Sequence, residues 1–502
     1  MSGRPLTRRE LLARTGTAAG GAALLGSGVL GTARALGAEP GAPAWLEPEV
    51  RASRDGRLAT QLRVAETEVT IARRPARAVV YDGSFPGPTL EVHAGDELAI
   101  DLVNDARQVT NLHTHGLHVS PRRPGDDVLL DIEPGEAFGY RYAIPADHPG
   151  GTFWYHAHRH MLTDNQVFGG LFGMLVVRGE LDRLPGIAGL EERAFVFGQM
   201  EVVDGRVADA DTSSLSDQVT LVNGRYRPAL WMRTGRTQRW RLVNTSSVFL
   251  RVRLDDHPLH VVAIDGNALP ATTAHDVLEL PPGGRADVLV QAPRAGTFAL
   301  RSLSWEEYGV FYSSMVPVPQ VLATLVVEGP PAEPAPLPTT LLAVDDLRDV
   351  RVDRRRTFRL EEREPRGVGP LDAFEYYING RMVDVSRVDE QIPLNATEEW
   401  VIRNLTYEPH PLHIHVNPFQ VVAIDGDRRR GEDHYRDSAL VPPYGSLTIR
   451  HRFLDFTGVF VMHCHILFHE DHGMMQILEV YGKDGPGPKR LPGGGHGGGH
   501  HH

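Results

Sequence analysis

Four His-x-His pairs stand out in the sequence, two in its first third and two near its C-terminal end. The pairs are His113 and His115, His156 and His158, His413 and His415, and His463 and His465. Side chains alternate between the two faces of a β-strand, so each pair places both imidazoles on one face, about 6.5 to 7 Å apart. Imidazole binds copper, zinc, iron and nickel, and eight converging imidazoles exceed what one ion needs. The pairs therefore predict a cluster of several metal ions.

A second set of candidate ligands surrounds Cys464, which is the only cysteine in a sequence with 24 histidines. This set consists of His410, Cys464, His469 and Met474. Two imidazoles, a thiolate and a thioether form the ligand set of a blue-copper electron-transfer site, whose potential the methionine tunes. A lone cysteine is more often a buried apolar side chain, but its neighbours favour the metal site here. Because Cys464 stands between His463 and His465, the chain itself would connect the two sites.

An internal repeat shows which elements must position these residues. The sequence of residues 261–266 recurs at 421–426, and at the same offset Asn244 matches Asn404 without a gap. The first third joins the repeat through Asn104. A Gly-x-Phe strand opening is the second anchor, at Gly151, Gly296 and Gly458. The repeat indicates three copies of one β domain.

Counting from these anchors, the histidine pairs occupy equivalent positions in the first and third copies. The middle copy has Arg253 and Asp255 at one pair of positions and Arg301 and Leu303 at the other. We therefore expect the cluster between copies one and three. The segment His257–His260 repeats the letters of residues 410–413 but lies seven residues later on the repeat, and we interpret it as structural.

Composition and strand patterning agree with an all-β chain of about three domains. Hydrophobic residues make up 41% and charged residues 23%, and short runs rich in branched and aromatic residues are bounded by Gly, Pro, Asn and Asp, which is typical of β-sandwiches and barrels. The expected segments are a leader at 1–37, domains at 55–180, 187–328 and 340–482, and a Gly/His tail at 483–502. We assign no role to the tail. The second junction is the proline-rich stretch 330–338.

The charge balance and the leader limit the partners and the location. A net charge of -12 argues against a general nucleic-acid binder, because phosphate contact requires a basic surface. Arg8 and Arg9 precede a short Ala/Gly/Leu stretch and a small-residue cleavage point, the layout of a twin-arginine signal peptide. No segment is apolar over the length of a membrane span. We expect an exported protein in the periplasm, the cell envelope or the medium.

Taken together, the motifs resemble the four copper signatures of the three-domain multicopper oxidases, the bacterial laccase-like family. The motifs are His113-Thr-His-Gly116, His156-Ala-His158, His410-Pro-Leu-His-Ile-His415 and the segment from His463 to Met474, and the similarity runs from about residue 60 to Tyr481. The resemblance implies three tandem cupredoxin-like Greek-key domains and four copper ions. It assigns His410, Cys464, His469 and Met474 to the type 1 copper, and His113 and His413 to the type 2 copper. One type 3 copper would be held by His115, His156 and His465, and the other by His158, His415 and His463.

The same resemblance implies a reaction. Small electron donors such as phenols or aromatic amines would give single electrons to the type 1 copper, and O2 would be reduced to water at the other three ions. A metallo-oxidase of Cu(I), Fe(II) or Mn(II) is the alternative, although the methionine cluster frequent in such relatives is missing. A copper store, an electron carrier or a copper-free structural relative is a further alternative, which the complete ligand set disfavours. We expect a monomer.

Water formation consumes protons, so acidic residues near the cluster are further candidates. Glu470 resembles the acid that relays protons in bacterial laccase-like relatives, and a solvated surface glutamate is the alternative. Another family acid matches Asp126 or Asp127, and spacing does not choose between them. Three other histidines near the motifs are off the repeat-equivalent positions and are interpreted as supporting or structural residues: His118, His160 and His472.

Overall fold

The computed structural model describes residues 42–72, 74–210, 213, 218–304, 319–363 and 375–491. The signal peptide proposed at residues 1–37 and the Gly/His-rich residues 492–502 lie outside this part, so the signal peptide stays a prediction. Strands predominate, and α2 (Thr163–Gly169) and α3 (Leu467–Asp471) are short, as are the 3-10 turns η1 (Leu181–Arg183) and η3 (Arg428–Arg430). The all-β prediction is confirmed. Among the described residues, no helix has the length and apolar character needed to cross a membrane.

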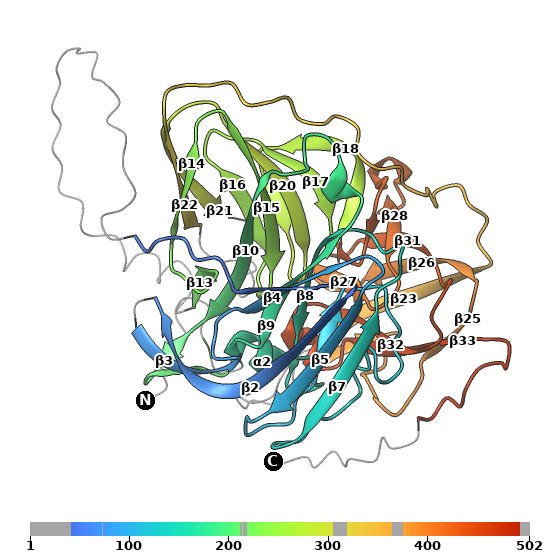
Figure 1. The fold of residues 1–502 in the computed structure, drawn as a ribbon. Coiled ribbons are helices and arrows are strands. Elements are labelled where there is room, and N and C mark those ends of the chain that lie inside the picture. The colour runs from blue at the N-terminus through green and yellow to red at the C-terminus, as the bar shows by residue number, and fades with distance from the viewer. Residues whose placement is uncertain are drawn as a thin grey trace, which may run out of the picture. The chain divides into compact units, whose positions relative to one another are not determined.

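The first copy contains a five-stranded and a six-stranded sheet (Figure 1). In spatial order the five-stranded sheet consists of β1 (Val50–Ala52), β4 (Gly87–His93), β9 (Phe172–Arg178), β8 (Gly151–His156) and β6 (His113–His115). The six-stranded sheet consists of β11 (Val202–Val203), β12 (Arg206–Val207), β3 (Arg74–Tyr81), β2 (Arg57–Ile71), β5 (Glu97–Asn104) and β7 (Ala137–Ala143). Its first two strands, β11 and β12, come from residues 202–207, which lie beyond the predicted end of the first domain at residue 180.

The middle copy has the same pair of sheets. The six-stranded sheet has the order β13 (Val219–Val222), β10 (Glu191–Met200), β15 (Arg236–Asn244), β20 (Arg285–Ala292), β17 (Leu259–Ile264) and β18 (Asn267–His275). The five-stranded sheet has the order β14 (Ala229–Arg233), β22 (Gln320–Glu328), β21 (Gly296–Ser302), β16 (Leu250–Leu254) and β19 (Leu278–Leu280). This copy supplies the green and yellow strands of Figure 1.

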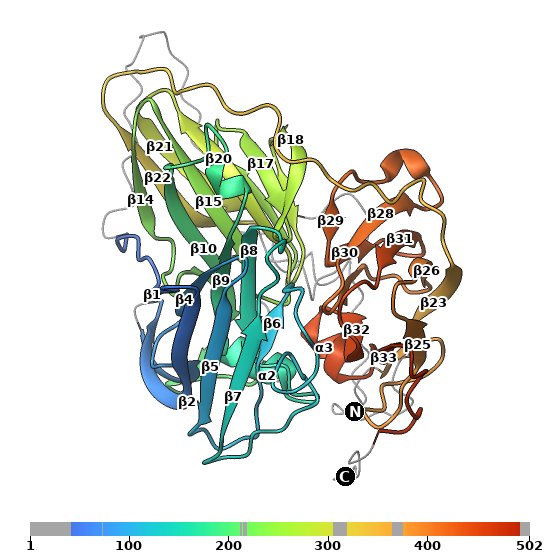
Figure 2. The same cartoon turned by 45° about the vertical axis from the view of Figure 1, so that its right-hand side comes forward.

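The third copy, orange to red in Figure 2, repeats this arrangement. Its six-stranded sheet has the order β24 (Glu375–Ile378), β23 (Arg354–Arg363), β26 (Thr397–Asn404), β31 (Ser446–Arg452), β28 (Phe419–Ile424) and β29 (Tyr435–Arg436). Its five-stranded sheet has the order β25 (Glu390–Pro393), β33 (Met475–Tyr481), β32 (Gly458–Cys464), β27 (His410–Ile414) and β30 (Ser438–Val441). The middle and third copies thus share their full strand order, and the first copy shares with them four consecutive strands of each sheet, with its remaining strands added at the opposite edges.

Strand register confirms the alignment of the repeat residue by residue. Each copy has two pairs of equivalent positions, one counted from the shared asparagine and one from the shared glycine. In every copy the first residues of the two pairs lie opposite each other on neighbouring antiparallel strands. The opposed residues are His113 and His156, Arg253 and Arg301, and His413 and His463. The Gly-x-Phe anchors open β8, β21 and β32, as the repeat predicts. Two side chains that face each other across an antiparallel pair have Cβ atoms about 5 Å apart, so the histidines of one copy converge.

Each copy packs its sheets over a separate apolar core. Trp240 in β15 and Trp400 in β26 occupy equivalent positions and are almost completely buried, with exposed fractions of 1% and 0%. Trp240 belongs to the core of the middle copy and Trp400 to that of the third. Burying an aromatic side chain of this size contributes roughly 2–3 kcal/mol. The three cores therefore fix the strands independently of any metal.

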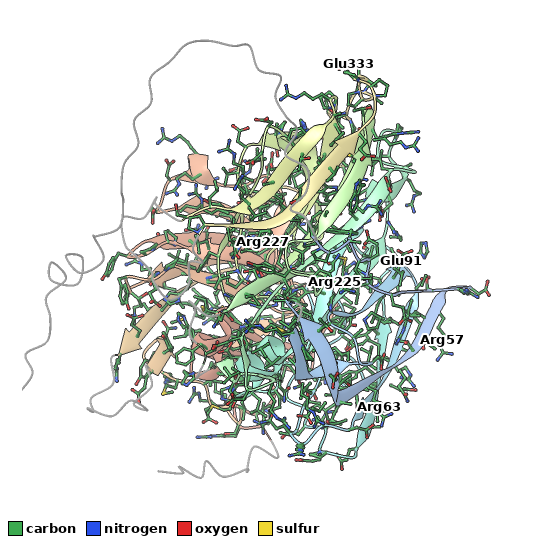
Figure 3. All side chains as sticks on the ribbon, turned by 90° about the vertical axis from the view of Figure 1, so that its left-hand side faces the viewer. Arg57, Arg63, Glu91, Arg225, Arg227 and Glu333 are labelled. Carbon is green, nitrogen blue, oxygen red and sulfur yellow. The ribbon has the colours of Figure 1, made fainter. Side chains whose placement is uncertain are left out.

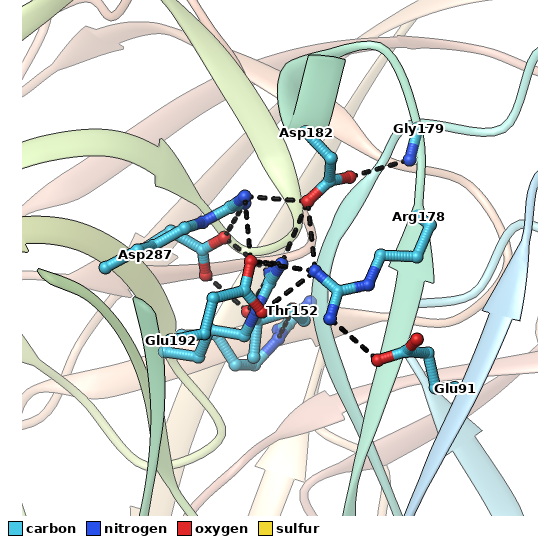
Figure 4. A network of polar contacts seen from close by, with 10 residues as sticks. Glu91, Thr152, Arg178, Gly179, Asp182, Glu192 and Asp287 are labelled. Carbon is cyan, nitrogen blue, oxygen red and sulfur yellow. Dashed lines mark hydrogen bonds and ion pairs between the residues drawn. The ribbon is translucent and has the colours of Figure 1, made fainter. Parts of the chain in front are cut away.

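The junction between the first two copies is a charged network rather than a loose linker (Figure 4). Arg178 at the end of β9 contacts both carboxylate oxygens of Glu192 at 2.8 Å, and Asp182 accepts from Arg178 and from Arg239. Asp287 accepts from Arg241 at 2.9 Å. Buried charges are tolerated only when they are paired, so this network fixes how β15 and β20 meet the first copy.

Ion pairs at the outer surface are of a different kind (Figure 3). Arg57 and Arg63 project outward from β2, and Arg57 lies 3.3 Å from Glu97. Both arginine side chains are more than half exposed. Exposed pairs of this kind contribute about 0–1 kcal/mol, so they do not decide the fold.

Residues 483–491, which the sequence places in the tail, contact the third copy. The amide of Val388 donates to the Lys489 carbonyl, and the amide of Leu491 donates to the Ser386 carbonyl, both at 2.8 Å. This segment lacks strand-like patterning of its own, and its partner residues lie about 100 positions earlier, so no local pattern predicts the contact.

Candidate metal centre

Cys464 lies at the centre of the first group of candidate ligands. Its Sγ is 3.5 Å from His410 Nδ1 and 3.7 Å from His469 Nδ1, and these two nitrogens are 3.2 Å apart. His410 opens β27, Cys464 closes β32, and His469 lies in α3, which follows β32 directly. All three side chains are buried.

Met474 completes the predicted set and has an exposed fraction of 0%. The chain turns at Gly473, whose φ of 121° lies in the left-handed region that glycine tolerates, and then enters β33. The Met474 carbonyl accepts from the Cys464 amide at 3.1 Å, and its amide donates to the His469 carbonyl at 2.9 Å. These bonds fix the methionine beside the cysteine and histidine ligands.

The Nε2 atoms of His410 and His469, which point away from Cys464, have different partners. His410 Nε2 is 2.8 Å from the Thr406 hydroxyl. His469 Nε2 lies 3.4 Å from a carboxylate oxygen of Glu408, and the His469 ring stacks on Tyr376 with centroids 4.0 Å apart. Burial raises the pKa of the Cys464 thiol, so a thiolate here requires a nearby cation. A metal ion held by Cys464, His410 and His469 would supply that charge.

The other eight histidines form one buried cluster between the first and third copies. His115 Nδ1 is 3.2 Å from His465 Nε2, and His463 Nε2 is 3.3 Å from His158 Nε2 and 3.1 Å from His415 Nε2. Two stacked pairs cross the interface, each with ring centroids 3.8 Å apart: His113 with His415, and His115 with His413. The pairs predicted from the repeat therefore do converge.

Several ring nitrogens of this cluster have no hydrogen-bond partner in the part of the chain that the structure describes. They are His113 Nε2, His156 Nε2, His413 Nε2, His415 Nδ1 and His465 Nδ1. In three of these rings the opposite nitrogen is bonded, to Asp126 at 2.7 Å, to the Ala157 carbonyl at 2.8 Å and to the Asp437 carbonyl at 2.8 Å. Unpaired buried polar atoms are costly, whereas neutral imidazoles with inward lone pairs fit metal ions.

Protonation supports the same interpretation. Burial lowers the pKa of His158 and of His463 to about 4, and it lowers the pKa of His115 and of His465 as well. At neutral pH these rings are therefore unprotonated, which is the form that binds a metal.

The ligand atoms gather in groups within 4.8 Å of one another. The groups are His113, His413 and His415; His158, His415 and His463; His113, His115 and His156; His115, His413 and Asp437; and His410, Cys464 and His469. The pairs do not all lie within strands as expected: His158, His415 and His465 follow the last residue of β8, β27 and β32. Their amides are still held: that of His415 donates to the Val461 carbonyl, that of His465 to the Pro411 carbonyl, and that of His158 to Asn111 Oδ1.

The structure separates the two aspartates that spacing could not. Asp126 Oδ2 lies 2.7 Å from His113 Nδ1, and its other oxygen accepts from the Thr114 amide at 2.8 Å. Asp127 instead pairs with Arg123 and accepts from the Leu129 amide. Burial raises the pKa of Asp126 to about 7. The carboxyl beside the cluster is therefore that of Asp126.

Glu470 is fully buried, which excludes a solvated surface glutamate. One carboxylate oxygen is 2.9 Å from His463 Nδ1 and the other 3.4 Å from His158 Nε2. Burial raises the pKa of Glu470. A carboxyl group that touches two cluster histidines and holds its proton more strongly than usual is positioned to exchange protons with the cluster.

The remaining histidines named above have structural contacts. His118 bridges the first and third copies through the Val416 carbonyl and Asp455, and His472 Nδ1 bonds the Phe468 carbonyl. His160 lies 4.0 Å from Asp471. In the middle copy, His257 bonds the Asp255 carbonyl and packs on Phe298, while His260 lies in β17.

Three residues at the centre escaped the sequence analysis: Glu408, Arg285 and Asp437. Glu408 could have been found, because it stands two residues before His410 in the same motif. Arg285 and Asp437 belong to no histidine motif and are far apart along the chain, so the sequence contained no signal that they meet.

Sequence models of the multicopper oxidase family match this chain in three segments: residues 63–182, 200–321 and 353–484. "Multicopper oxidase mco" of Staphylococcus aureus is 26% identical over 412 residues, covering 80% of this chain and 83% of that protein. "Cell division protein FtsP" of Dickeya dadantii is 27% identical over 422 residues, covering 81% of this chain and 85% of that protein.

The fold comparison agrees. The multicopper oxidase of Campylobacter jejuni, described as a metallo-oxidase, superimposes with a TM-score of 0.75 at 25% identity, covering 88% of this chain and 98% of that one.

Proposed function

Because this chain belongs to the multicopper oxidase family, we propose that it couples one-electron oxidation of small aromatic donors, such as phenols and aromatic amines, to the reduction of O2 to water. The observation that supports this most directly is the complete set of buried donor groups: ten imidazoles and one thiol in two adjoining sites. When bound, four copper ions would supply the reversible one-electron chemistry. His410, Cys464, His469 and Met474 would hold one ion, and the eight paired histidines would hold three.

The chain provides a short connection between the two sites. Cys464 belongs to the first site, and its direct neighbours His463 and His465 belong to the second. His463 and Cys464 lie in β32, whose register with β27 is fixed by the pairing of His413 with His463. The connection therefore consists of covalent bonds held in a rigid strand, which favours fast electron transfer over a fixed distance.

Two carboxyl groups flank the histidine cluster on different sides. Glu470 touches His463 and His158, and Asp126 touches His113. Burial raises the pKa of both groups, to about 7 for Asp126. We assign to them the delivery of protons for water formation, because each touches a cluster histidine and holds its proton more strongly than an ordinary carboxyl group.

The surface near His410 offers apolar side chains to an aromatic donor. Leu405, Tyr407 and Tyr444 are exposed large side chains. Leu405 and Tyr407 lie in the loop before β27, in which Thr406 contacts His410, and the Tyr444 amide donates to the Thr406 carbonyl. A flat apolar ring system gains binding energy on such a surface.

Oxidation of Cu(I), Fe(II) or Mn(II) is the second candidate. It is favoured by the likeness to the C. jejuni metallo-oxidase and by the Glu408 carboxylate beside His469, since carboxylates bind hard cations. The likeness to the cell division protein FtsP raises a third candidate, a role that does not use oxidase chemistry. The complete set of metal ligands argues against this candidate, because such a role would not need it.

The test is copper loading followed by O2 consumption. We expect four copper ions per chain, an intense blue absorption, and turnover that is faster with a panel of phenols than with Cu(I), Fe(II) or Mn(II). Faster turnover with a metal ion would replace the first candidate with the second. Copper-loaded protein that consumes no O2 with any donor would contradict both.

A further inference from the structure

The middle copy, which has no copper ligand at the repeat-equivalent positions, is linked to the histidine cluster by a buried ion pair. We infer that Arg285, acting through Asp437, is a positioning residue that orients His115 and His413, one histidine from each of the two copies that form the cluster. This inference rests on the proposed copper centre and adds to it a role for the middle domain.

Arg285 opens β20 of the middle copy, and its side chain has an exposed fraction of 0%. Nη1 donates to Asp437 Oδ1 at 2.7 Å and Nη2 donates to Oδ2, so the guanidinium binds both carboxylate oxygens. Nη1 also donates to the Gly283 carbonyl at 3.1 Å, and Nε donates to the Thr152 carbonyl at 3.3 Å. Arg285 therefore reaches all three copies with one side chain.

Asp437, between β29 and β30 of the third copy, faces the cluster. Its Oδ1 is 3.3 Å from His115 Nε2 and 3.4 Å from His413 Nδ1, and its carbonyl is 2.8 Å from the same His413 nitrogen. The Ser438 hydroxyl donates to Oδ1 at 2.9 Å and lies 3.2 Å from His413 Nδ1. These acceptors keep a proton on His115 Nε2 and on His413 Nδ1, which leaves His115 Nδ1 and His413 Nε2 with lone pairs toward the cluster.

Two glycines make room for this arrangement. A Cβ atom on Gly116, the residue after His115, would lie 2.3 Å from Arg285 Nη2 and 2.5 Å from Asp437 Oδ2. A Cβ atom on Gly283 would lie 2.8 Å from the His465 ring. The final glycine of the His113–Gly116 motif thus accommodates an ion pair formed by the other two copies.

The ion pair also solves an electrostatic problem. A buried carboxylate beside two imidazoles would be strongly destabilised without a cation, and Arg285 supplies one that cannot lose its proton. Burial acts to raise the pKa of Asp437, but the charge of Arg285 outweighs it and holds the pKa well below the ordinary value. Asp265 of the middle copy is a second carboxyl group beside Arg285, 3.5 Å from Nη1, so one guanidinium serves both carboxyl groups while Asp437 orients the histidines.

The anchoring of Arg285 continues into the network of Figure 4. Thr152, whose carbonyl accepts from Arg285, donates through its hydroxyl to Asp287, which accepts from Arg239 and Arg241. Thr152 lies in β8, the strand that ends at His156. The middle copy is thereby bonded to the strands that end in cluster histidines.

The test measures copper binding and its spectrum in full-length Arg285→Met, Asp437→Asn and the double variant. Arg285→Met is expected to weaken copper affinity of the histidine cluster roughly 10- to 100-fold and to change the EPR spectrum of its paramagnetic copper. The blue absorption of the Cys464 site is expected to stay unchanged. If Arg285 acts through Asp437, Arg285→Met adds no further loss in the Asp437→Asn background. Full additivity would overturn the inference.

Arg356→Met is the matched control, because Arg356 is also a buried arginine that binds both carboxylate oxygens of one partner, Glu398, and neither residue contacts a cluster histidine. It is expected to lower the thermal midpoint while copper affinity and the EPR spectrum stay as in wild type. An equal spectral change in Arg356→Met, or wild-type affinity and spectrum in Arg285→Met, would overturn the inference. Should Arg285→Met fail to fold, Arg285→Lys keeps the charge without the two-pronged contact, and the same spectral change is expected.

Copper bound normally by all these variants would leave the proposed function intact and refute only the role of Arg285. Wild-type protein whose histidine cluster binds no copper would refute both.

Discussion

The middle copy and its two neighbours share the four central strands of each sheet and their register, yet different side chains occupy the same positions. Where the first and third copies oppose His113 to His156 and His413 to His463, the middle copy opposes Arg253 to Arg301. Arg301 bonds Asp255 at 2.9 Å, and both side chains remain substantially exposed. The difference shows that the fold offers the same positions in each copy. The residue type at these positions, histidine in the outer copies and arginine in the middle copy, decides which of them can bind metal.

Replacing Cys464 with serine is expected to have the largest effect on this contrast. Serine is nearly isosteric but lacks the thiolate, so the blue absorption and all donor-dependent O2 consumption should disappear. Because Cys464 lies in an independent apolar core, the circular dichroism spectrum and the thermal midpoint of apoprotein should change little. Retained turnover would contradict the assignment of the first site.

Replacing Glu470 with glutamine comes next. The change removes the proton but keeps the shape, so O2 reduction should slow about 100-fold or more, within the range for loss of a general acid. Stopped-flow reduction of the Cys464 site by a phenol under anaerobic conditions should proceed at the wild-type rate. Equal slowing of both steps would show that Glu470 is needed for structure rather than for proton delivery.

The pH dependence of apoprotein stability tests whether the outer copies, which bury the histidine cluster, respond differently from the middle copy. Burial lowers the pKa of His158 and His463 to about 4, whereas unfolded histidine titrates near 6.5. The unfolded chain therefore binds more protons between these values, and stability falls as pH drops from about 6.5 toward 4.

Buried carboxyl groups whose pKa is raised act in the opposite direction, among them Asp126 and Glu408 with a pKa of about 7, Asp265 with a pKa of about 6, and Glu470, but the buried histidines outnumber them. The thermal midpoint should fall by about 5 °C or more between pH 7.5 and pH 5. Hydrogen exchange should show faster opening of β6 and β27, with less change in β16 of the middle copy. An equal change in all three strands would contradict the claim that the buried histidines of the outer copies cause the loss of stability.

The smallest effect is expected for His260→Ala. His260 belongs to the segment that repeats the letters of a ligand motif, but it lies in β17 with only part of its surface buried. Copper stoichiometry, measured by atomic absorption, should not change, and stability should stay within about 0.5 kcal/mol of wild type. Loss of one copper ion would show that the middle copy binds metal after all.

The three-copy fold and most of the centre could be predicted from sequence because their signals are local and repeated. Asn404 and Gly458 mark equivalent strand positions, and counting from them finds His413 and His463. The residues that escaped prediction act only across the interfaces. Arg285 and Asp437 are ordinary members of their own strands and loops, and their contact depends on three copies meeting at Gly116.

The sequence by itself determined the all-β class, the repeat, and which imidazoles and thiol could bind metal, because side-chain alternation and fixed spacing are properties of the chain. Only the tertiary structure decided that Asp126 rather than Asp127 faces the cluster, that Glu470 is buried, and that the copy without ligands supports the centre. Burial and charge pairing depend on what other segments bring to a residue. No spacing within one segment encodes that neighbourhood.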